Sequence, residues 1–470
     1  MSWWRVCLFS VALASCTKPN PRSCQDGTCG EPAFPVCDVD GSLGGEPETC
    51  IAVECTPGEL ESCRGDSERR CNSDGTNYDV TRCERGCDEA ADGCRQCEPS
   101  ETVCANGRVN TCDTSGAVVA SETCALGYFE DQPRCRHITP SNNLGVYIDM
   151  TPMPPDIVLD AARFSTTNGE VRAGTTVIDV PSFLHPSTGN GAPIRVWVVR
   201  SLRLTSATVT GTGGRNETGP AAAIISLGDV VVRGELLVEY GVGAAQAGCT
   251  EAGRGGFTEN GSYSYSGGGG GGGHATAGAA GGSAGASTGG TGGSPSGNPT
   301  LVPLRGGCRG GFGYAAAPLY NNGGGALQIS SRTRLEVDGI VDANAAQAEV
   351  EQDASGSSVQ GGGAGGSILL EAPVVILGPD AQLLARGGLG AQCTADAFIQ
   401  CGAAGNGATA TSGANPGGTI APTPTNVYKA GGGGGGGLGR VRINTADGTY
   451  TKSSSVIEDA AVTAGTISSR

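Results

Sequence analysis

The chain has 470 residues, of which 82 are Gly and 21 are Cys, while aromatic residues make up 4%. Its net charge is −16, and residues 17–136 alone carry 11 basic and 23 acidic residues, net −12. An acidic chain lacks the cationic surface that neutralises phosphates, which argues against nucleic acid as a partner. A large aromatic core is likewise excluded.

The first sixteen residues have the pattern of an export signal. Arg5 precedes a short apolar stretch, residues 6–14, and Cys16 follows Leu13-Ala14-Ser15. Nine apolar residues are too few to cross a bilayer, so a retained transmembrane helix is not expected. The tetrad resembles a bacterial lipoprotein lipobox, which implies cleavage before Cys16 and lipidation of that residue. The alternative is an ordinary cleaved signal peptide in which Cys16 is only a nearby cysteine.

The resemblance to lipoproteins also implies a location. The protein would be bound to a membrane through its lipid in the bacterial cell envelope. Thr17 stands where an Asp would act as the inner-membrane retention signal of such lipoproteins, so the expected site is the outer membrane, with the protein exposed at the surface. No later stretch of 18 or more apolar residues offers a second attachment.

Cysteines next form an internal repeat. Both copies begin alike and keep eleven residues between their third and fourth cysteines, while Tyr128 takes the place of the fifth cysteine in copy two. Export favours disulfides, each contributing about 2–4 kcal/mol, in units too small to fold on an apolar core. The candidates in the repeats are Cys55, Cys63, Cys71, Cys83, Cys87, Cys94, Cys97, Cys104, Cys112 and Cys124.

The missing fifth cysteine predicts one unpaired thiol. Cys135 is the candidate, because the lost position is its nearest partner. Six cysteines allow 15 connectivities, and the sequence does not choose among them. The rival for this region is a zinc site, although the region has no His before His137. The close pairs that superficially suit zinc are Cys24/Cys29, Cys83/Cys87 and Cys94/Cys97.

From about residue 137 the chain changes to short β-branched runs bounded by Gly. Three segments beginning at Ala223, Ala326 and Ser367 each have the pattern strand, corner, strand, Gly, strand over about 20 residues, the length of one solenoid coil. This arrangement resembles a right-handed parallel β-helix with Gly-rich insertions, and it resembles secreted Cys- and Gly-rich proteins of large-genome Gram-negative bacteria. The fold class expected is therefore mainly β, with a solenoid-like domain preceded by small disulfide-rich repeats.

Three insertions interrupt the coils, at residues 243–322, 344–360 and 388–430, and we expect them to project from one edge. Pairing within a loop predicts the disulfides Cys249–Cys308 and Cys393–Cys401. The alternative for residues 267–297 is plain disorder.

The predicted organisation has five parts. They are a signal peptide (1–15), a Cys-containing stalk (16–52), Cys-rich repeat one (53–96), repeat two (97–136) and the Gly-rich β-solenoid domain (137–470).

Motifs for chemistry are absent from the sequence. No Ser/His/Asp order, HExxH helix or nucleophile elbow occurs, and Gly267–Gly273 lacks the Gly-Lys-Ser/Thr ending of a phosphate loop. No catalytic residue or cofactor is predicted. If calcium binds, its candidate ligands are Glu336, Asp338 and Asp342, which resemble the acidic ligands of β-helix polysaccharide lyases; the alternative is a solvated charge ladder.

The expected function is non-enzymatic: a structural, adhesive or glycan-binding role, with extracellular glycan or envelope and matrix components as partners. One rival is a carbohydrate-active enzyme on a β-helix. Another is a protein-binding module in the cysteine repeats, with the solenoid as spacer.

Overall fold

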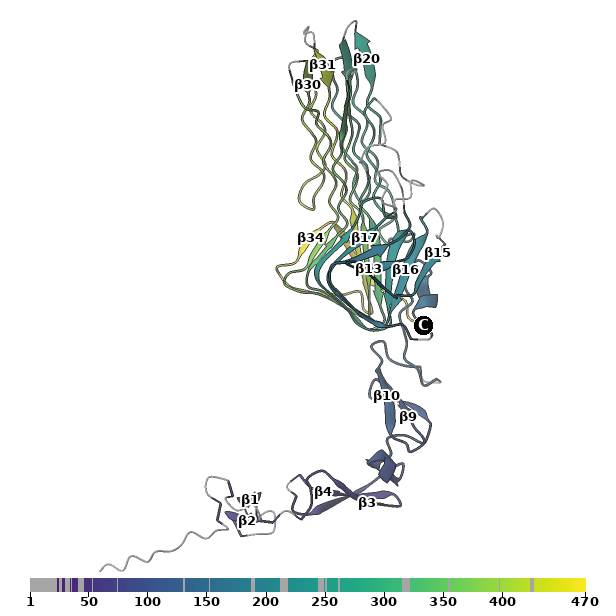
Figure 1. Cartoon of the computed structure of the whole chain (residues 1–470), viewed down its shortest axis with the longest axis vertical. Coiled ribbons are helices and arrows are strands. Elements are labelled where there is room, and N and C mark those ends of the chain that lie inside the picture. The colour runs from purple at the N-terminus through teal and green to yellow at the C-terminus, as the bar shows by residue number, and fades with distance from the viewer. Residues whose placement is uncertain are drawn as a thin grey trace, which may run out of the picture. The chain divides into compact units, whose positions relative to one another are not determined.

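The computed structural model describes most of the chain after residue 22 (Figure 1). The described residues are 23–24, 28–29, 34, 36–40, 46–52, 54–73, 75–129, 132–151, 153–186, 191–211, 219–243, 249, 252–260, 263–314, 322–353, 356–396, 398–422 and 427–470. Two compact units are present, residues 1–123 with 128–135, and residues 124–127 with 136–470. The division lies next to the predicted boundary at residue 137. The signal peptide and Cys16 lie outside the described residues.

The first unit consists of small antiparallel sheets. Its strands are β1 (Val36–Asp38), β2 (Thr49–Ile51), β3 (Leu60–Arg64), β4 (Ser67–Cys71), β5 (Tyr78–Arg82), β6 (Cys87–Asp88), β7 (Gly93–Cys94), β8 (Thr102–Ala105), β9 (Arg108–Cys112) and β10 (Val118–Thr123), with the 3₁₀ turn η1 (Glu89–Ala91). The sheet β3-β4-β5 in repeat one corresponds to β8-β9-β10 in repeat two. Cysteines dominate the buried apolar residues, as the low apolar content predicts.

Two large sheets form the base of the second unit. One contains β15 (Ser182–His185), β16 (Ile194–Val199), β18 (Ala221–Ser226), β22 (Ala326–Ser331), β27 (Ser367–Glu371), β32 (Arg440–Thr445) and β35 (Ala461–Thr466). The other contains β11 (Asp156–Leu159), β12 (Ala162–Ser165), β13 (Val171–Ala173), β14 (Thr176–Ile178), β17 (Ser201–Thr210), β19 (Val230–Val238), β23 (Arg334–Val337), β24 (Ile340–Asp342), β28 (Val374–Leu377), β29 (Gln382–Leu384), β33 (Thr451–Lys452) and β34 (Ile457–Asp459).

Both sheets are mixed, with antiparallel pairs at the β14 and β15 ends and parallel pairing through the rest. From β16 onward the chain passes alternately from one sheet to the other, and the apolar residues meet between them. Successive parallel strands stay aligned, so Trp197, Ile224, Ile329, Leu370 and Ile443 stand side by side in this core. The prediction of a mainly β chain with many disulfides is confirmed.

The smaller of these sheets is covered on both faces. In β18, Ala222 and Ile224 join the core between the sheets, while Ala221, Ala223 and Ile225 join a second core with Ile138, Leu144 and Ile148. Leu144 belongs to the 3₁₀ turn η2 (Leu144–Tyr147). A strand buried on both faces has a continuous apolar sequence, which explains the run from Ala221 to Ile225.

Polar contacts hold the covering segment to this sheet. The Glu371 carboxylate is fully buried and accepts hydrogen bonds from the backbone N–H of Ser141 (3.0 Å), from its hydroxyl (2.6 Å), and from Gln328, Ser330 and Asn444 at 2.8–2.9 Å. A buried carboxylate requires such donors because it has lost its hydration. Glu371 thereby connects residue 141 to three strands of the sheet.

The described parts of the glycine-rich insertions are ordered chains that rise together from this base (Figure 1). They make hydrogen bonds to one another in place of ladder strands. Gly431, Gly434 and Gly437 donate to Ser266, Gly269 and Gly272 of one neighbouring chain at 2.8–2.9 Å. A period of three residues is that of a polyproline II-type helix, which has no internal hydrogen bonds. In this protein, neighbouring chains satisfy the backbone. We call the whole assembly the glycine bundle.

Residues 431–437 are surrounded on six sides. They donate to three chains, at residues 266–272, 415–418 and 388–391, and accept from three others, at residues 279–282, 362–365 and 405–408. Residues 267–273 are surrounded in the same way by chains at 253–256, 279–282, 290–293, 311, 359–362 and 434–437. A Cβ added at any of these fourteen glycines would overlap a neighbouring backbone carbonyl oxygen. The two seven-glycine runs are therefore central chains of the bundle.

Outer chains tolerate side chains once per turn. Along 287–297, Thr288, Thr291 and Ser294 are exposed while the glycine pairs between them face neighbouring chains. The alternative that residues 267–297 are disordered is therefore wrong. The insertions extend together, as predicted, but as one hydrogen-bonded body.

We expect Gly434→Ala to destabilise the mature chain by about 3 kcal/mol or more, because the new methyl group would push against the backbone of residues 279 and 280. Gly413→Ala is the matched control, since nothing lies within 4 Å of its added Cβ. Urea denaturation of both variants measures the difference. Equal midpoints would contradict the close packing of the central chains.

Candidate functional site: the far end of the glycine bundle

A four-stranded sheet closes the bundle at the end away from the base (Figure 1). Its order is β20 (Phe257–Asn260), β21 (Tyr263–Ser266), β31 (Tyr428–Ala430) and β30 (Ile399–Cys401), and we call it the distal sheet. β21, β31 and β30 each continue directly into a glycine chain. The change from strand to threefold helix occurs where residues such as Tyr, Ser and Ile are followed by Gly. Alternating side chains stabilise a strand, and their absence lets threefold helices pack closely.

A small core lies beneath this sheet. Val359, Ala391, Cys393, Ile399 and Ala430 are buried together, and the disulfide Cys393–Cys401 lies at its edge. The hairpin of β25 (Val350–Asp353) and β26 (Gly356–Val359) brings Val359 into this core. The bundle therefore ends in a folded surface rather than in frayed loops.

Aromatic residues gather at this end, although the chain has few of them. Phe398 is 68% exposed and Phe257 is 39% exposed. The Phe257 ring stacks on Tyr314, with centroids 4.4 Å apart. Exposed rings on an ordered support are typical of binding surfaces. The sequence analysis did not single out these residues; the available signal was the clustering of aromatics next to glycine runs in an aromatic-poor chain.

Lys429 in the distal sheet is buried rather than reactive. Its ammonium donates to the carbonyl oxygen of Ala421 at 3.2 Å and lies 5.8 Å from the ring centroid of Tyr265. Both contacts compensate part of the hydration that burial removes. Lys429 is therefore held in the interior of the distal end by a carbonyl and a ring face.

The predicted acidic residues are not brought together. Glu336 pairs with Arg334 on its own strand at 2.5 Å, and the strands on either side place Val231 and Ile376 next to it. Asp342 accepts from the backbone and side-chain nitrogens of Asn344 at 2.7 and 3.0 Å. Burial raises the pKa of Asp342 above its ordinary value.

Asp338 accepts only a long bond from the backbone of Asp380, at 3.4 Å. Among the described residues, no group of three potential metal ligands contains Glu336, Asp338 or Asp342. The geometry matches a set of separate polar contacts better than a shared calcium site.

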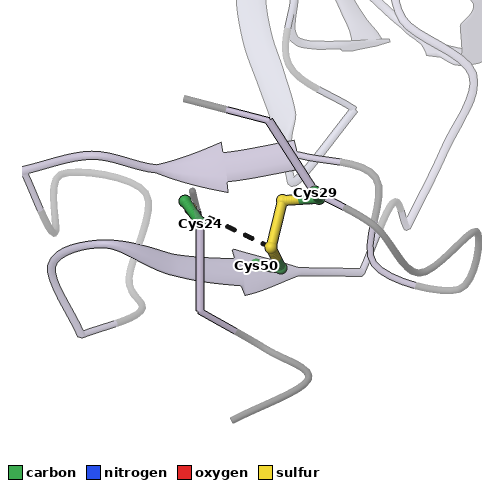
Figure 2. A group of neighbouring side chains, drawn as sticks. All are labelled: Cys24, Cys29 and Cys50. Carbon is green, nitrogen blue, oxygen red and sulfur yellow. Dashed lines mark hydrogen bonds between the residues drawn. A yellow bond between two sulfur atoms is a disulfide. The ribbon is translucent and has the colours of Figure 1, made fainter. Parts of the chain in front are cut away.

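The two ligand-like groups that do occur contain bonded cysteines. In one, Cys29 and Cys50 form a disulfide and the Cys24 sulfur lies 3.9 Å from that of Cys50, as Figure 2 shows. Cys24 is itself bonded to Cys37. In the other, Glu68 lies beside Cys83 and Cys87, which are bonded to Cys94 and Cys63. Zinc binds thiolates, so these disulfides argue against the zinc alternative.

Two further disulfides occupy matching positions in the two repeats, Cys55–Cys71 and Cys97–Cys112. The predicted pair Cys249–Cys308 in the first insertion is also bonded. Cys124 and Cys135 are both disulfide-bonded. Among the described residues the free cysteine is Cys104, so the assignment of the free thiol to Cys135 is wrong. The reason is that Tyr128 replaces the counterpart of Cys87, whose partner Cys63 corresponds to Cys104.

The three histidines lie apart. His185 contacts Tyr147 at 3.3 Å, His137 accepts from Arg332 at 2.8 Å, and His274 is fully buried where the glycine run 267–273 ends. The His274 Nε2 lies 3.0 Å from the Ser367 hydroxyl. Burial, with Arg440 and Arg305 nearby, lowers the pKa of His274 to about 3. The contact with Ser367 connects the end of this glycine run to β27 of the base.

We expect mature chain that is denatured without reduction to carry one alkylatable thiol, at Cys104. Mass spectrometry after iodoacetamide labelling of residues 17–470 measures it. Cys104→Ser should remove the label. Tyr128→Cys should remove it too, because the new cysteine would pair with Cys104 as Cys87 pairs with Cys63 in the first repeat. Labelling at Cys135 in the native sequence would contradict the assignment.

Comparisons with protein-family profiles, curated proteins and solved structures found no match to this chain. Within the described part of the chain, no helix has the length and apolar character needed to span a membrane.

Proposed function

We propose that this protein is a non-enzymatic adhesive protein of the bacterial envelope, in which the glycine bundle holds a binding surface at the distal sheet away from its base. The observation that carries the proposal is the six-sided hydrogen bonding of residues 267–273 and 431–437. Glycine loses more conformational freedom on ordering than other residues, so an ordered bundle is maintained only by many simultaneous bonds. Such a body suits a stiff support.

The features of the distal end support a role in binding rather than catalysis. Exposed rings at Phe257 and Phe398 lie over a small core that is fixed by the disulfide Cys393–Cys401. A rigid surface pays less ordering entropy when it binds a partner. The partner class we propose is an extracellular glycan or another component of the envelope or matrix.

Attachment and location form part of the same proposal. Lipidation of Cys16 would anchor the mature chain, and a second acyl chain would make that anchoring stable. The many disulfides suit an oxidising compartment outside the cytoplasm. We place the protein at the outer membrane, exposed at the surface.

We also propose that the base is a solenoid-type scaffold of the right-handed parallel β-helix kind. The alternation of strands between two sheets and the side-by-side alignment of Trp197, Ile224 and Ile329 support this reading. Its sheets are mixed at one end, where antiparallel pairs occur. In this proposal the coils supply the base from which the glycine chains extend.

The test is a screen of soluble residues 17–470 against a panel of bacterial and plant polysaccharides, with calcium and with EDTA. We expect retention on at least one polysaccharide, unchanged by EDTA, with no new reducing ends or unsaturated products. Cys16→Ser in cells should release the protein from the membrane fraction. Turnover that EDTA abolishes, and that Glu336→Gln with Asp342→Asn also abolishes, would overturn the proposal in favour of a lyase.

Binding retained by residues 17–136 alone would favour a third function, a recognition module in the cysteine repeats. Absence of retention on every polysaccharide and on intact cells would contradict an adhesive role.

A further inference from the structure

The tetrapeptide Arg-Gly-Gly-Phe occurs twice, at Arg254–Phe257 and at Arg309–Phe312. The first copy ends at Phe257, where β20 of the distal sheet begins, and the second lies on a chain of the glycine bundle. Because such a chain has three residues per turn, Arg309 and Phe312 of the second copy point to the same side. In the second copy the Arg309 guanidinium lies 5.1 Å from the centroid of the Phe312 ring.

The two copies are neighbours in space. The backbone N–H of Gly255 donates to Phe312 O at 3.0 Å, and Arg254 Nε donates to Gly313 O at 3.2 Å. The disulfide Cys249–Cys308 joins the two chains below the copies, and the stacking of Phe257 on Tyr314 joins them above. These contacts bring together five residues, which we call the Arg–aromatic strip: Arg254, Phe257, Arg309, Phe312 and Tyr314.

This strip is accessible and cationic. Arg254 is exposed, Phe257 is 39% exposed, and Arg309, Phe312 and Tyr314 are half-buried. Among the described residues, neither Arg254 nor Arg309 forms an ion pair. A related tetrapeptide at Arg386–Leu389 has Leu in place of Phe, and its arginine does form an ion pair: Arg386 pairs with Asp459 at 2.5 Å. Within the described part of the chain, the strip therefore carries two cations that have no ion-pair partner, in a chain of net charge −16.

We propose that the Arg–aromatic strip binds an acidic polysaccharide whose sugars carry carboxylates. Guanidinium groups pair with carboxylates in a planar, two-bond geometry, and flat rings offer apolar faces to the C–H faces of sugars. Residues 309–314 span about 16 Å at the rise of a threefold helix, enough for a short run of sugar rings. The straight strip favours an extended polymer over a compact ligand.

Two cations are few for a nucleic-acid site. Proteins that bind nucleic acid neutralise several phosphates with cationic side chains, and this chain is acidic overall. Glu259 also lies on the same face of β20 as Phe257 and is exposed, so it weakens the binding of any polyanion there. Single-stranded nucleic acid is the alternative occupant that the experiment must separate.

This inference rests on the proposed adhesive function and names its partner class. The experiment uses soluble residues 17–470 and affinity electrophoresis in gels containing polygalacturonate, with dextran as the neutral reference. We expect retardation by polygalacturonate alone, weakened by salt. Arg309→Gln with Phe312→Ala should reduce the affinity at least tenfold, and Glu259→Gln should raise it two- to threefold.

The matched control is Arg386→Gln with Leu389→Ala, which changes the same motif outside the strip and should leave the affinity within twofold. Unchanged thermal melting of each variant shows that the fold survives. Equal affinity of the strip variant and the native chain would overturn the inference, as would tighter binding of oligothymidylate than of polygalacturonate. Retention on other polysaccharides only would overturn the inference while leaving the adhesive function in place.

Discussion

Hydrogen bonding between glycine backbones is the interaction on which this structure depends. Every turn of a threefold chain directs three N–H groups and three carbonyls toward different neighbours, so a chain with six neighbours leaves no backbone group for water. Residues 431–437 satisfy that condition in both directions. The composition follows from it, because an added Cβ at any residue of a central chain would overlap a neighbouring carbonyl oxygen.

Such a bundle has no apolar core of its own and must be held at its ends. At the base, His274 and Arg440 lie where glycine chains pass into the sheets, with the Arg440 guanidinium 3.4 Å from the carbonyl oxygens of His274 and Ser296. At the other end, a small core and the Cys393–Cys401 disulfide fix the distal sheet. The outer chains carry one exposed side chain per turn, so the bundle presents these side chains at regular intervals on a stiff support.

The sequence predicted the base and the cysteine pattern better than the bundle. Strands such as Ala221–Ser226 carry a strong local signal because both of their faces are buried. Pairing of Cys249 with Cys308 was predictable from loop closure, and the free thiol at Cys104 could have been found by matching repeat positions instead of by nearness. The glycine runs have no side chains to reveal their partners, and those partners lie far away in the sequence.

The sequence does contain one local pattern that indicates the threefold chains of the bundle. The spacing of Thr288, Thr291 and Ser294 with glycine pairs between them marks a chain that has one free side per turn. The proposed binding surface gives a second example. Arg309 and Phe312 are separated by two glycines, which suggest a linker in the sequence but align the two side chains in a threefold helix.

The most direct test of the account is amide hydrogen exchange of residues 267–272 and 431–437 in the native mature chain. The six-neighbour arrangement predicts that all these glycine amides are protected and that they exchange only with global unfolding of their unit. Thr288, Thr291 and Ser294 on the outer chain serve as an internal comparison. Exchange of the two glycine runs at the rates of an unstructured peptide would contradict the hydrogen-bonded bundle, and the proposed support role with it.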